Sequence, residues 1–508
     1  PSHITQRFSG SDVSGVYFRG SVLMTAYDLI IRNGTVIDGS GAPRHDADVA
    51  VDGDRIAAIG DLSGAQGRSE IDATGLIVAP GFIDVHTHDD HALLSRPDMA
   101  FKASQGVSTV VVGNCGISLA PLTFEGDRPP APLDLLGDGF RFPRMADFFD
   151  ALEKTPAALN AAALCGHSTL RVGAMDDLDR PATDAEIDAM RDALGEALDA
   201  GAIGMSTGLY YDPAKEAPTA EVIRLAELLG PAKGLYTTHL RNEGAQLEQA
   251  MEEAFEIGRA AGVKVVLSHH KSSGRPNFGK TVESLALIEK TRKEQPVTLD
   301  VYPYDASSTV LQYERVLVSK RTIVTWSEPR PDVAGRDLSD IATEMGCGEE
   351  EAAAALQPAG AIYFMMDEDD VQRVLKYPHA MIASDGLPHD VFPHPRLWGT
   401  FPRVLGHYSR DLGLMPLEEA VHRMSGLPAS EFGLTGRGVL APGNHADIVI
   451  FNATTVADRA DFEHPTEAAA GISIVMVNGQ TVWRDGAATG ARPGHALKRQ
   501  DLQAEAGS

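Results

Sequence analysis

The sequence predicts an α/β fold in which a (β/α)8 barrel of the TIM type is joined to a small β-sandwich domain built from both ends of the chain. A chain of 508 residues exceeds the size at which one hydrophobic core usually stops growing, so more than one domain is expected. Eight short apolar or β-branched segments alternate with amphipathic helical stretches, which is the pattern of βα units in a parallel barrel. These segments end near Val85, Gly113, Gly166, Thr207, His239, Ser268, Val301 and Ser384.

β-Hairpin patterns at the two ends of the chain predict the sandwich. Residues 25–79 alternate apolar segments with turn dipeptides such as Asn33-Gly34 and Asp52-Gly53, which favour tight turns between strands. The same alternation returns in residues 436–490. We therefore expect these two ranges to form one domain and residues 80–435 to form the barrel.

Two further segments have a separate character. Residues 304–376 connect the seventh and eighth predicted strands, and this is too long for an ordinary βα loop. Insertions of this size often act as lids over an active site, although a surface subdomain without contact to substrate is the alternative. Residues 1–24 are rich in Ser, Gly and Arg and are typical of a leader or disordered extension.

The composition excludes several classes of partner. A formal net charge of −27 argues against binding to nucleic acid or to an anionic membrane, because both are polyanions. No apolar stretch reaches the roughly 18 to 20 residues that span a bilayer. The three cysteines, Cys115, Cys165 and Cys347, are too far apart in sequence for a disulfide framework, which favours the reducing cytoplasm. The oligomeric state is not indicated by the sequence.

Candidate metal ligands follow five of the eight predicted strands. In His86-Thr87-His88, two imidazoles on an extended backbone point to the same side and can reach one metal ion. Such a pair alone often only packs, but Cys115, His239, His269 and Asp385 each end another strand, on the face where barrels gather catalytic residues. Two imidazoles and a thiolate suit Zn²⁺ and leave one coordination position open. We expect one tightly bound zinc at Cys115, His239 and His269, and a second, weaker metal at the histidine pair and Asp385, with Cys115 able to bridge.

Asp385 is also the predicted proton carrier. Zinc lowers the pKa of its bound water, and a carboxylate beside it can take that proton and deliver it to a leaving amine. The alternative is that Asp385 is a turn residue before Gly386.

These motifs resemble the amidohydrolase superfamily and, within it, the D-aminoacylase (N-acyl-D-amino-acid deacylase) family. The resemblance covers about Tyr27 to Pro493 and is carried by Gly81-Phe82-Ile83-Asp84-Val85-His86-Thr87-His88 and by Gly113-Asn114-Cys115-Gly116. Most members of the superfamily bridge two metals with a carboxylated lysine or a glutamate, whereas this family uses a cysteine on strand two. The predicted fourth strand, residues 203–207, contains no lysine. The resemblance implies hydrolysis of a small-molecule N-acyl-D-amino acid to a carboxylate and the free D-amino acid.

The resemblance further implies which residues bind the substrate's α-carboxylate. Lys271, Tyr302 and Arg396 match family positions for this role, and two cations and a phenol can hold a carboxylate through charge-assisted hydrogen bonds. Without the resemblance, the two cations would be taken for solvated surface charges.

The resemblance also bears on which amino-acid side chain the substrate carries. Arg315 matches a position where the N-acyl-D-glutamate deacylase branch carries an arginine for the side-chain carboxylate, so D-glutamate is expected. Leu317, Tyr363 and Met366 resemble the pocket of broader D-aminoacylases, so apolar substrates (D-leucine, D-methionine or D-phenylalanine derivatives) are the alternative. A hydantoinase-like hydrolase of cyclic amides is a further alternative. A non-catalytic scaffold is disfavoured, because the full ligand set is present.

Overall fold

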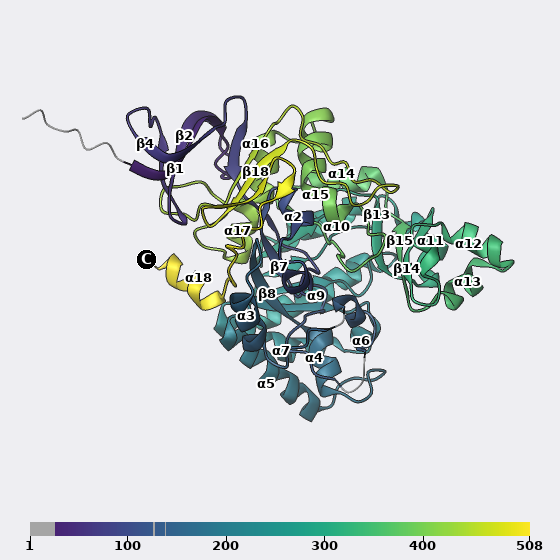
Figure 1. Ribbon diagram of the computed structural model, residues 1–508. Coiled ribbons are helices and arrows are strands. Elements are labelled where there is room, and N and C mark those ends of the chain that lie inside the picture. Colours follow the sequence, from purple (N-terminus) through teal and green to yellow (C-terminus); the bar gives the residue numbers. More distant parts are fainter. Residues whose placement is uncertain (1–25, 125–127, 138, 508) are drawn as a thin grey trace, which may run out of the picture.

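The computed structural model describes residues 26–124, 128–137 and 139–507 of the chain. Its centre is a parallel eight-stranded sheet ringed by helices (Figure 1). The strands follow one another around the sheet in sequence order: β6 (Phe82–Asp84), β7 (Val107–Val112), β8 (Asn160–Gly166), β9 (Gly204–Gly208), β10 (Leu235–His239), β11 (Val265–Leu267), β12 (Val297–Val301) and β16 (Ala380–Ile382). Each ends within two residues of its predicted position, and the predicted barrel is confirmed. The predicted leader, residues 1–24, lies outside the described residues.

The first and last barrel strands are joined by contacts beyond the regular ladder. Thr87 and Gly386 form an isolated parallel bridge. The buried Lys102 ammonium lies 2.7 Å from an Asp84 carboxylate oxygen and 2.5 Å from the Ser384 hydroxyl oxygen. A buried cation needs such partners because its charge is costly away from water. The two strand ends are thereby held side by side.

Local sequence signals explain the outer helices. The longest, α5 (Asp184–Ala200), begins at a capping box in which the Thr183 hydroxyl accepts from the Glu186 amide and the Glu186 carboxylate accepts from the Thr183 amide. It ends at Gly201, whose φ of 123° suits a residue without a side chain. The other main barrel helices are α3 (Met145–Lys154), α4 (His167–Ala174), α7 (Thr219–Ala226), α9 (Leu247–Ala261), α10 (Thr281–Thr291), α14 (Glu368–Lys376), α15 (Arg396–Arg403) and α16 (Leu417–Met424).

Apolar side chains fill the barrel and continue beyond the N-terminal ends of its strands. The interior cluster around Leu164 extends to Leu427 of α17 (Gly426–Phe432) and Leu502 of α18 (Arg499–Ala506). These helices pack against the N-terminal ends of the strands. Among the described residues, no helix is both long and apolar enough to cross a membrane.

The two ends of the chain meet in one nine-stranded sheet beside the barrel. Its strands are β1 (Ala26–Val36), β2 (His45–Asp52), β3 (Arg55–Gly60), β4 (Gln66–Asp72), β5 (Ile77–Pro80), β17 (Ile448–Phe451), β18 (Ile472–Val477), β19 (Gln480–Arg484) and β20 (Ala487–Ala488). The antiparallel pair β5–β17 joins the N-terminal and C-terminal strands. The predicted turn between β2 and β3 is present directly after Asp52, with Gly53 and Asp54 as its two turn residues, but the turn predicted at Asn33-Gly34 is wrong. These two residues lie within β1 at a shift in register, where Asn33 takes a φ of 59° and its amide bonds to Asp48.

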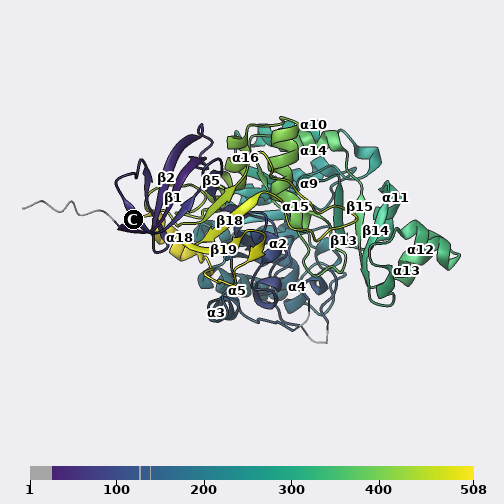
Figure 2. The same ribbon diagram turned by 45° about the horizontal axis from the view of Figure 1, so that its top comes forward.

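The long connection between β12 and β16 forms its own small layer. It contains a three-stranded antiparallel sheet, in the order β13 (Ala306–Val310), β15 (Ala359–Phe364) and β14 (Thr322–Ser327), with helices α11 (Tyr313–Val318), α12 (Leu338–Met345) and α13 (Glu349–Ala355). Figure 2 shows this insertion projecting from the barrel on the side opposite to β1 and β2. The final helix of the predicted range, α14, contacts the barrel helix α10 and the strand β16.

Candidate metal centre

Six side chains of metal-ligand type converge at the C-terminal ends of the barrel strands. They follow β6, β7, β11 and β16 or end β10, and all six are buried. In each of three subsets the ligand atoms lie within 4.8 Å of one another: His86, His88 and Cys115; Cys115, His239 and His269; and His86, His269 and Asp385. The structure therefore brings together all six residues that the sequence suggested.

Cys115 lies between the two predicted metal positions. Its Sγ is 3.2 Å from His86 Nε2 and 3.4 Å from His269 Nε2. Burial by itself would raise the pKa of the Cys115 thiol, but His86 and His269 outweigh burial and hold the pKa well below its ordinary value. The thiolate is the form that binds metal.

Two glycines explain how the Cys115 loop passes so close to its neighbours. A Cβ on Gly113 would lie 2.2 Å from the Leu164 carbonyl oxygen, and one on Gly116 would lie 2.8 Å from the Gly208 amide nitrogen. Both glycines also have positive φ values, 80° and 76°. Steric fit and backbone conformation therefore both favour glycine at these two positions of the loop.

Three of the six candidate ligands have left-handed backbone conformations. Cys115, His269 and Asp385 have φ values of 53°, 36° and 49°. For residues other than glycine this costs roughly 1–3 kcal/mol each, and such strain gathers at functional sites. Backbone strain is thus present at three strand ends whose side chains point towards one centre.

The donor set fits a divalent cation such as zinc. It combines a thiolate, imidazoles and a carboxylate, which are zinc's usual ligands. Neither ring nitrogen of the buried His239 has a hydrogen-bond partner among the described residues, and Glu243 Oε2 is 3.8 Å from its Nε2. Buried polar atoms without partners are costly, and a metal ion would satisfy this imidazole.

Asp300 is an outer carboxylate that the sequence reasoning missed. It lies on β12, and its Oδ1 is 3.2 Å from His86 Nδ1 and accepts a 2.8 Å hydrogen bond from the His269 amide. Partners of this kind fix the orientation and tautomer of a ligating histidine. An acidic residue inside the otherwise apolar or β-branched strand 297–301 was the available signal.

Glu243 is a second carboxylate beside the centre that the sequence reasoning missed. Its Oε1 lies 3.1 Å from His269 Nδ1 and 2.7 Å from Lys271 Nζ. Burial would raise the pKa of Glu243, but Lys271, His239 and His269 outweigh it and hold the pKa well below the ordinary value. Its position four residues after His239 carried no signal that the sequence reasoning could use.

The three residues predicted to bind the α-carboxylate surround one aromatic ring. The Tyr302 ring has Arg396 Cζ 4.6 Å and Lys271 Nζ 5.6 Å from its centroid. Arg396 also pairs with Asp385 at 2.8 Å. The buried Tyr302 hydroxyl has no hydrogen-bond partner within the described part of the chain. A phenol and two cations therefore stand together beside the candidate metal ligands.

Arg315 is buried and rests on an aromatic platform. Its Cζ lies 4.3 Å from the ring centroid of Tyr210, and its Nε donates a 3.2 Å hydrogen bond to the Tyr210 hydroxyl. Within the described ranges it forms no ion pair with a carboxylate. It lines the same pocket as His88, His239, His269 and Asp385. Tyr210 was not identified from the sequence, because its contact with Arg315 spans 105 residues.

The insertion supplies one wall of that pocket. Ser307, Ser308 and Thr309 of β13 and Arg315 of α11 line it together with the metal-ligand side chains. The insertion is therefore not a remote surface subdomain.

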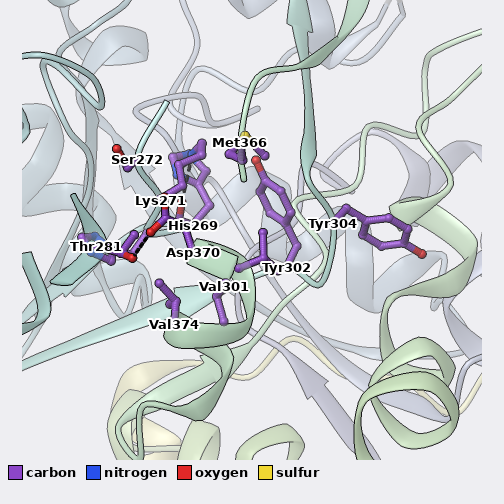
Figure 3. A pocket seen from close by; sticks show the side chains of 12 residues that line it. His269, Lys271, Ser272, Thr281, Val301, Tyr302, Tyr304, Met366, Asp370 and Val374 are labelled. Carbon is purple, nitrogen blue, oxygen red and sulfur yellow. Dashed lines mark hydrogen bonds between the residues drawn. The ribbon is translucent and has the colours of Figure 1, made fainter. Parts of the chain in front are cut away.

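The three residues that the sequence suggested for an apolar substrate pocket lie in different surroundings. Met366 lines a neighbouring pocket with His269, Lys271 and Tyr302 (Figure 3). Tyr363 is fully buried, and its hydroxyl accepts from the Gln312 amide and donates to a carbonyl oxygen. Tyr363 is not among the residues that line either pocket, and its ring centroid lies 6.0 Å from Arg315 Cζ. Leu317 is 59% exposed.

The chain is similar to proteins of known activity over most of its length. A model of the amidohydrolase family matches residues 69–303 and 335–483. A D-aminoacylase of Alcaligenes xylosoxydans xylosoxydans is 58% identical, covering 93% of this chain and 98% of the relative. From the same organism, an N-acyl-D-aspartate deacylase is 51% identical and an N-acyl-D-glutamate deacylase 49% identical, each over 93% of this chain and at least 95% of its own length.

Solved structures give the same result. A D-aminoacylase described with a binuclear metal centre has a TM-score of 0.91 at 57% identity and covers 93% of this chain and 100% of its own. An N-acyl-D-glutamate deacylase from Bordetella bronchiseptica, complexed with zinc and a phosphonate inhibitor, has a TM-score of 0.91 at 49% identity with the same coverage. The chain therefore belongs to the amidohydrolase family, in the group that contains D-aminoacylase and the N-acyl-D-amino-acid deacylases.

Proposed function

We propose that this protein is a zinc-dependent enzyme that hydrolyses the amide bond of N-acyl-D-amino acids, with N-acyl-D-glutamate as the preferred substrate. The observation that carries the proposal is the convergence of six ligand-type side chains beside three residues suited to a carboxylate. The relatives named for this activity align over nearly the whole chain. The cytoplasmic location stays a prediction from the sequence.

The metal would be held first by Cys115, His239 and His269, and a second, weaker metal by His86, His88 and Asp385. Zinc at this position supplies a Lewis acid that polarises the amide carbonyl and makes water acidic enough to react at neutral pH. Cys115 is close enough to His86 and His269 to be shared by both positions.

Asp385 is the residue we assign to proton transfer. One of its oxygens, Oδ2, pairs with Arg396 at 2.8 Å, and the other, Oδ1, faces His88 Nε2 at 3.3 Å. Arg396 stabilises the ionised carboxylate, which is the form that accepts a proton from the attacking water. Asp385 then delivers that proton to the departing amine nitrogen, so the amine leaves as a neutral group.

Lys271, Tyr302 and Arg396 would position the substrate through its α-carboxylate. The unpartnered Tyr302 hydroxyl is a ready donor, and the flanking cations provide charge-assisted hydrogen bonds. Fixing the carboxylate fixes which face of the amide meets the metal centre, which is the basis for selecting the D-enantiomer.

Arg315 is the observation that favours an acidic side chain. A buried guanidinium is normally paired with an anion, because a buried unpaired charge is costly, and a substrate carboxylate would complete this pair. The second candidate is an apolar N-acyl-D-amino acid. It is favoured by Ile117, Leu135 and Leu387, which line the same pocket, and by the 58% identity to a D-aminoacylase.

A substrate panel tests the proposal. The protein, supplied with zinc, is assayed with the N-acetyl derivatives of D-glutamate, D-aspartate, D-leucine, D-methionine and L-glutamate, and with hydantoin and dihydroorotate. We expect kcat/KM to be highest for N-acetyl-D-glutamate. A preference for the L-enantiomer or for a cyclic amide would contradict the assigned reaction, whereas a preference for D-leucine would contradict only the role of Arg315.

A further inference from the structure

Glu243 is buried at a point where the candidate metal centre and the candidate carboxylate site meet. The residue is 7% exposed and belongs to the loop between β10 and α9. The Asn242 side chain accepts from the amides of Gly244 and Gln246, and the Glu243 carbonyl accepts from the Ser273 amide at 2.7 Å. The loop is thus fixed from both sides, so the carboxylate is held in place by its backbone.

The first contact of Glu243 restricts the tautomer of His269. His269 Nε2 faces Cys115 Sγ at 3.4 Å, and its Nδ1 faces Glu243 Oε1 at 3.1 Å. A neutral imidazole that offers Nε2 to a metal carries its proton on Nδ1. Glu243 Oε1 is an acceptor for that proton, as in the carboxylate–histidine–metal arrangements of other proteins.

The second contact of Glu243 holds Lys271. Lys271 Nζ lies 2.7 Å from Glu243 Oε1, 2.7 Å from His269 Nδ1 and 2.9 Å from the His269 carbonyl oxygen. The contact with Nδ1 is a hydrogen bond only when Nδ1 has no proton. When His269 offers Nε2 to a metal, that bond is lost, and Lys271 keeps Glu243 and the carbonyl with a donor left for another acceptor.

We propose that Glu243 is a positioning residue shared by the two sites: it orients His269 for the metal and holds Lys271 at the pocket for the substrate carboxylate. The inference rests on the proposed function for the roles of His269 and Lys271. It predicts that one substitution weakens metal binding and substrate binding together.

The first test measures zinc affinity. Metal-free wild type, Glu243→Gln and Glu253→Gln are titrated with zinc in competition with a chromogenic chelator. Glutamine leaves one neutral oxygen for two donors, so the first zinc should bind about 10–100-fold more weakly, the usual effect of losing an outer partner. Glu253 pairs with Arg241 two residues before Glu243 and is the matched control, expected to bind zinc like wild type. Equal zinc affinity in wild type and Glu243→Gln would overturn the proposal.

The second test separates the two halves of the proposal at saturating zinc. Glu243→Gln should raise KM for N-acetyl-D-glutamate, and this increase should disappear in a Lys271→Met background if Glu243 acts on substrate through Lys271. An increase that persists in that background would overturn the Lys271 half. Glu243→Asp keeps the charge and should recover part of both effects; it also serves if Glu243→Gln does not fold.

Failure of the Glu243 proposal can be distinguished from failure of the proposed function. A wild-type protein that binds zinc but hydrolyses no N-acyl-D-amino acid would overturn the proposed reaction. The zinc comparison between wild type and Glu243→Gln would then still decide whether Glu243 positions His269.

Discussion

The two halves of the candidate metal centre differ in how fully the protein already satisfies them. In the cysteine half (Cys115, His239 and His269), His239 has no hydrogen-bond partner on either ring nitrogen among the described residues. In the aspartate half (His86, His88 and Asp385), the carboxylate pairs with Arg396 at 2.8 Å and lies 3.3 Å from His88 Nε2. A metal entering the cysteine half would therefore satisfy an imidazole that has no partner on either nitrogen, whereas one entering the aspartate half must compete with the Asp385–Arg396 pair.

This difference provides a physical reason for unequal affinity. Asp385 already has a cation beside it, so a second cation adds less stabilisation and meets repulsion from the Arg396 guanidinium. The thiolate also belongs to the cysteine half by its role as a strong zinc ligand. We therefore expect the first zinc in the cysteine half and the proton-transfer chemistry in the aspartate half.

The largest expected effect comes from removing a ligand of the cysteine half. Losing only an outer partner costs about 10–100-fold in affinity, so His239→Ala should weaken the first zinc by more than that and abolish turnover. His88→Ala is the matched control from the aspartate half and should retain the first zinc. Equal losses of the first zinc in both variants, measured by chelator competition, would remove the distinction between the halves.

Asp385→Asn should separate metal binding from catalysis. Asparagine keeps the shape but cannot carry the proton, and loss of a positioned general base costs about 10²–10⁴-fold in kcat. The first zinc should stay bound, because Asp385 lies in the other half. The checks are kcat, zinc content and circular dichroism of the purified variant. High residual turnover in a folded, zinc-loaded protein would exclude Asp385 as the proton carrier.

The convergence of the candidate ligand side chains was predictable from the topology of the barrel. Residues at the C-terminal ends of parallel strands meet on one rim wherever they lie in the sequence, so His86, Cys115, His239, His269 and Asp385 could be grouped without coordinates. The eight strand ends themselves followed from apolar and β-branched segments with regular spacing.

The outer contacts could not be predicted, because they depend on side-chain directions within the folded rim. Asp300 reaches His86 across 214 residues, and Tyr210 reaches Arg315 across 105. An acidic residue in an apolar strand marks Asp300 itself, but no local pattern identifies the partner in either pair. Local signals also misled once. Asn33-Gly34 has the composition of a hairpin turn, yet it forms an irregularity inside β1, which pairs with β2 on both sides of it.

Arg315→Leu should change specificity while leaving both halves of the metal centre intact. Hydrogen bonds to a charged group contribute about 1.5–3 kcal/mol, so kcat/KM for N-acetyl-D-glutamate should fall roughly 10–100-fold. N-acetyl-D-leucine should be hydrolysed as before or faster. Arg321→Leu is the matched control, since Arg321 lies in the same insertion and pairs with Asp337 away from the pocket. Parallel losses for acidic and apolar substrates would show that Arg315 is structural.

Asp300→Asn should have the smallest effect, and it should change metal affinity unequally in the two halves. Asp300 faces the ring nitrogen of His86, 3.2 Å away, but contacts His269 only through the backbone amide. Loss of its charge therefore weakens the orientation of the His86 ring, while an asparagine oxygen can still accept from the His269 amide. We expect the second metal to bind about tenfold more weakly and the first zinc to bind nearly as in wild type, measured as two successive steps of one titration. A larger loss for the first zinc would mean that Asp300 acts mainly by holding the His269 backbone rather than the His86 ring. Asp300 would then support both halves of the metal centre.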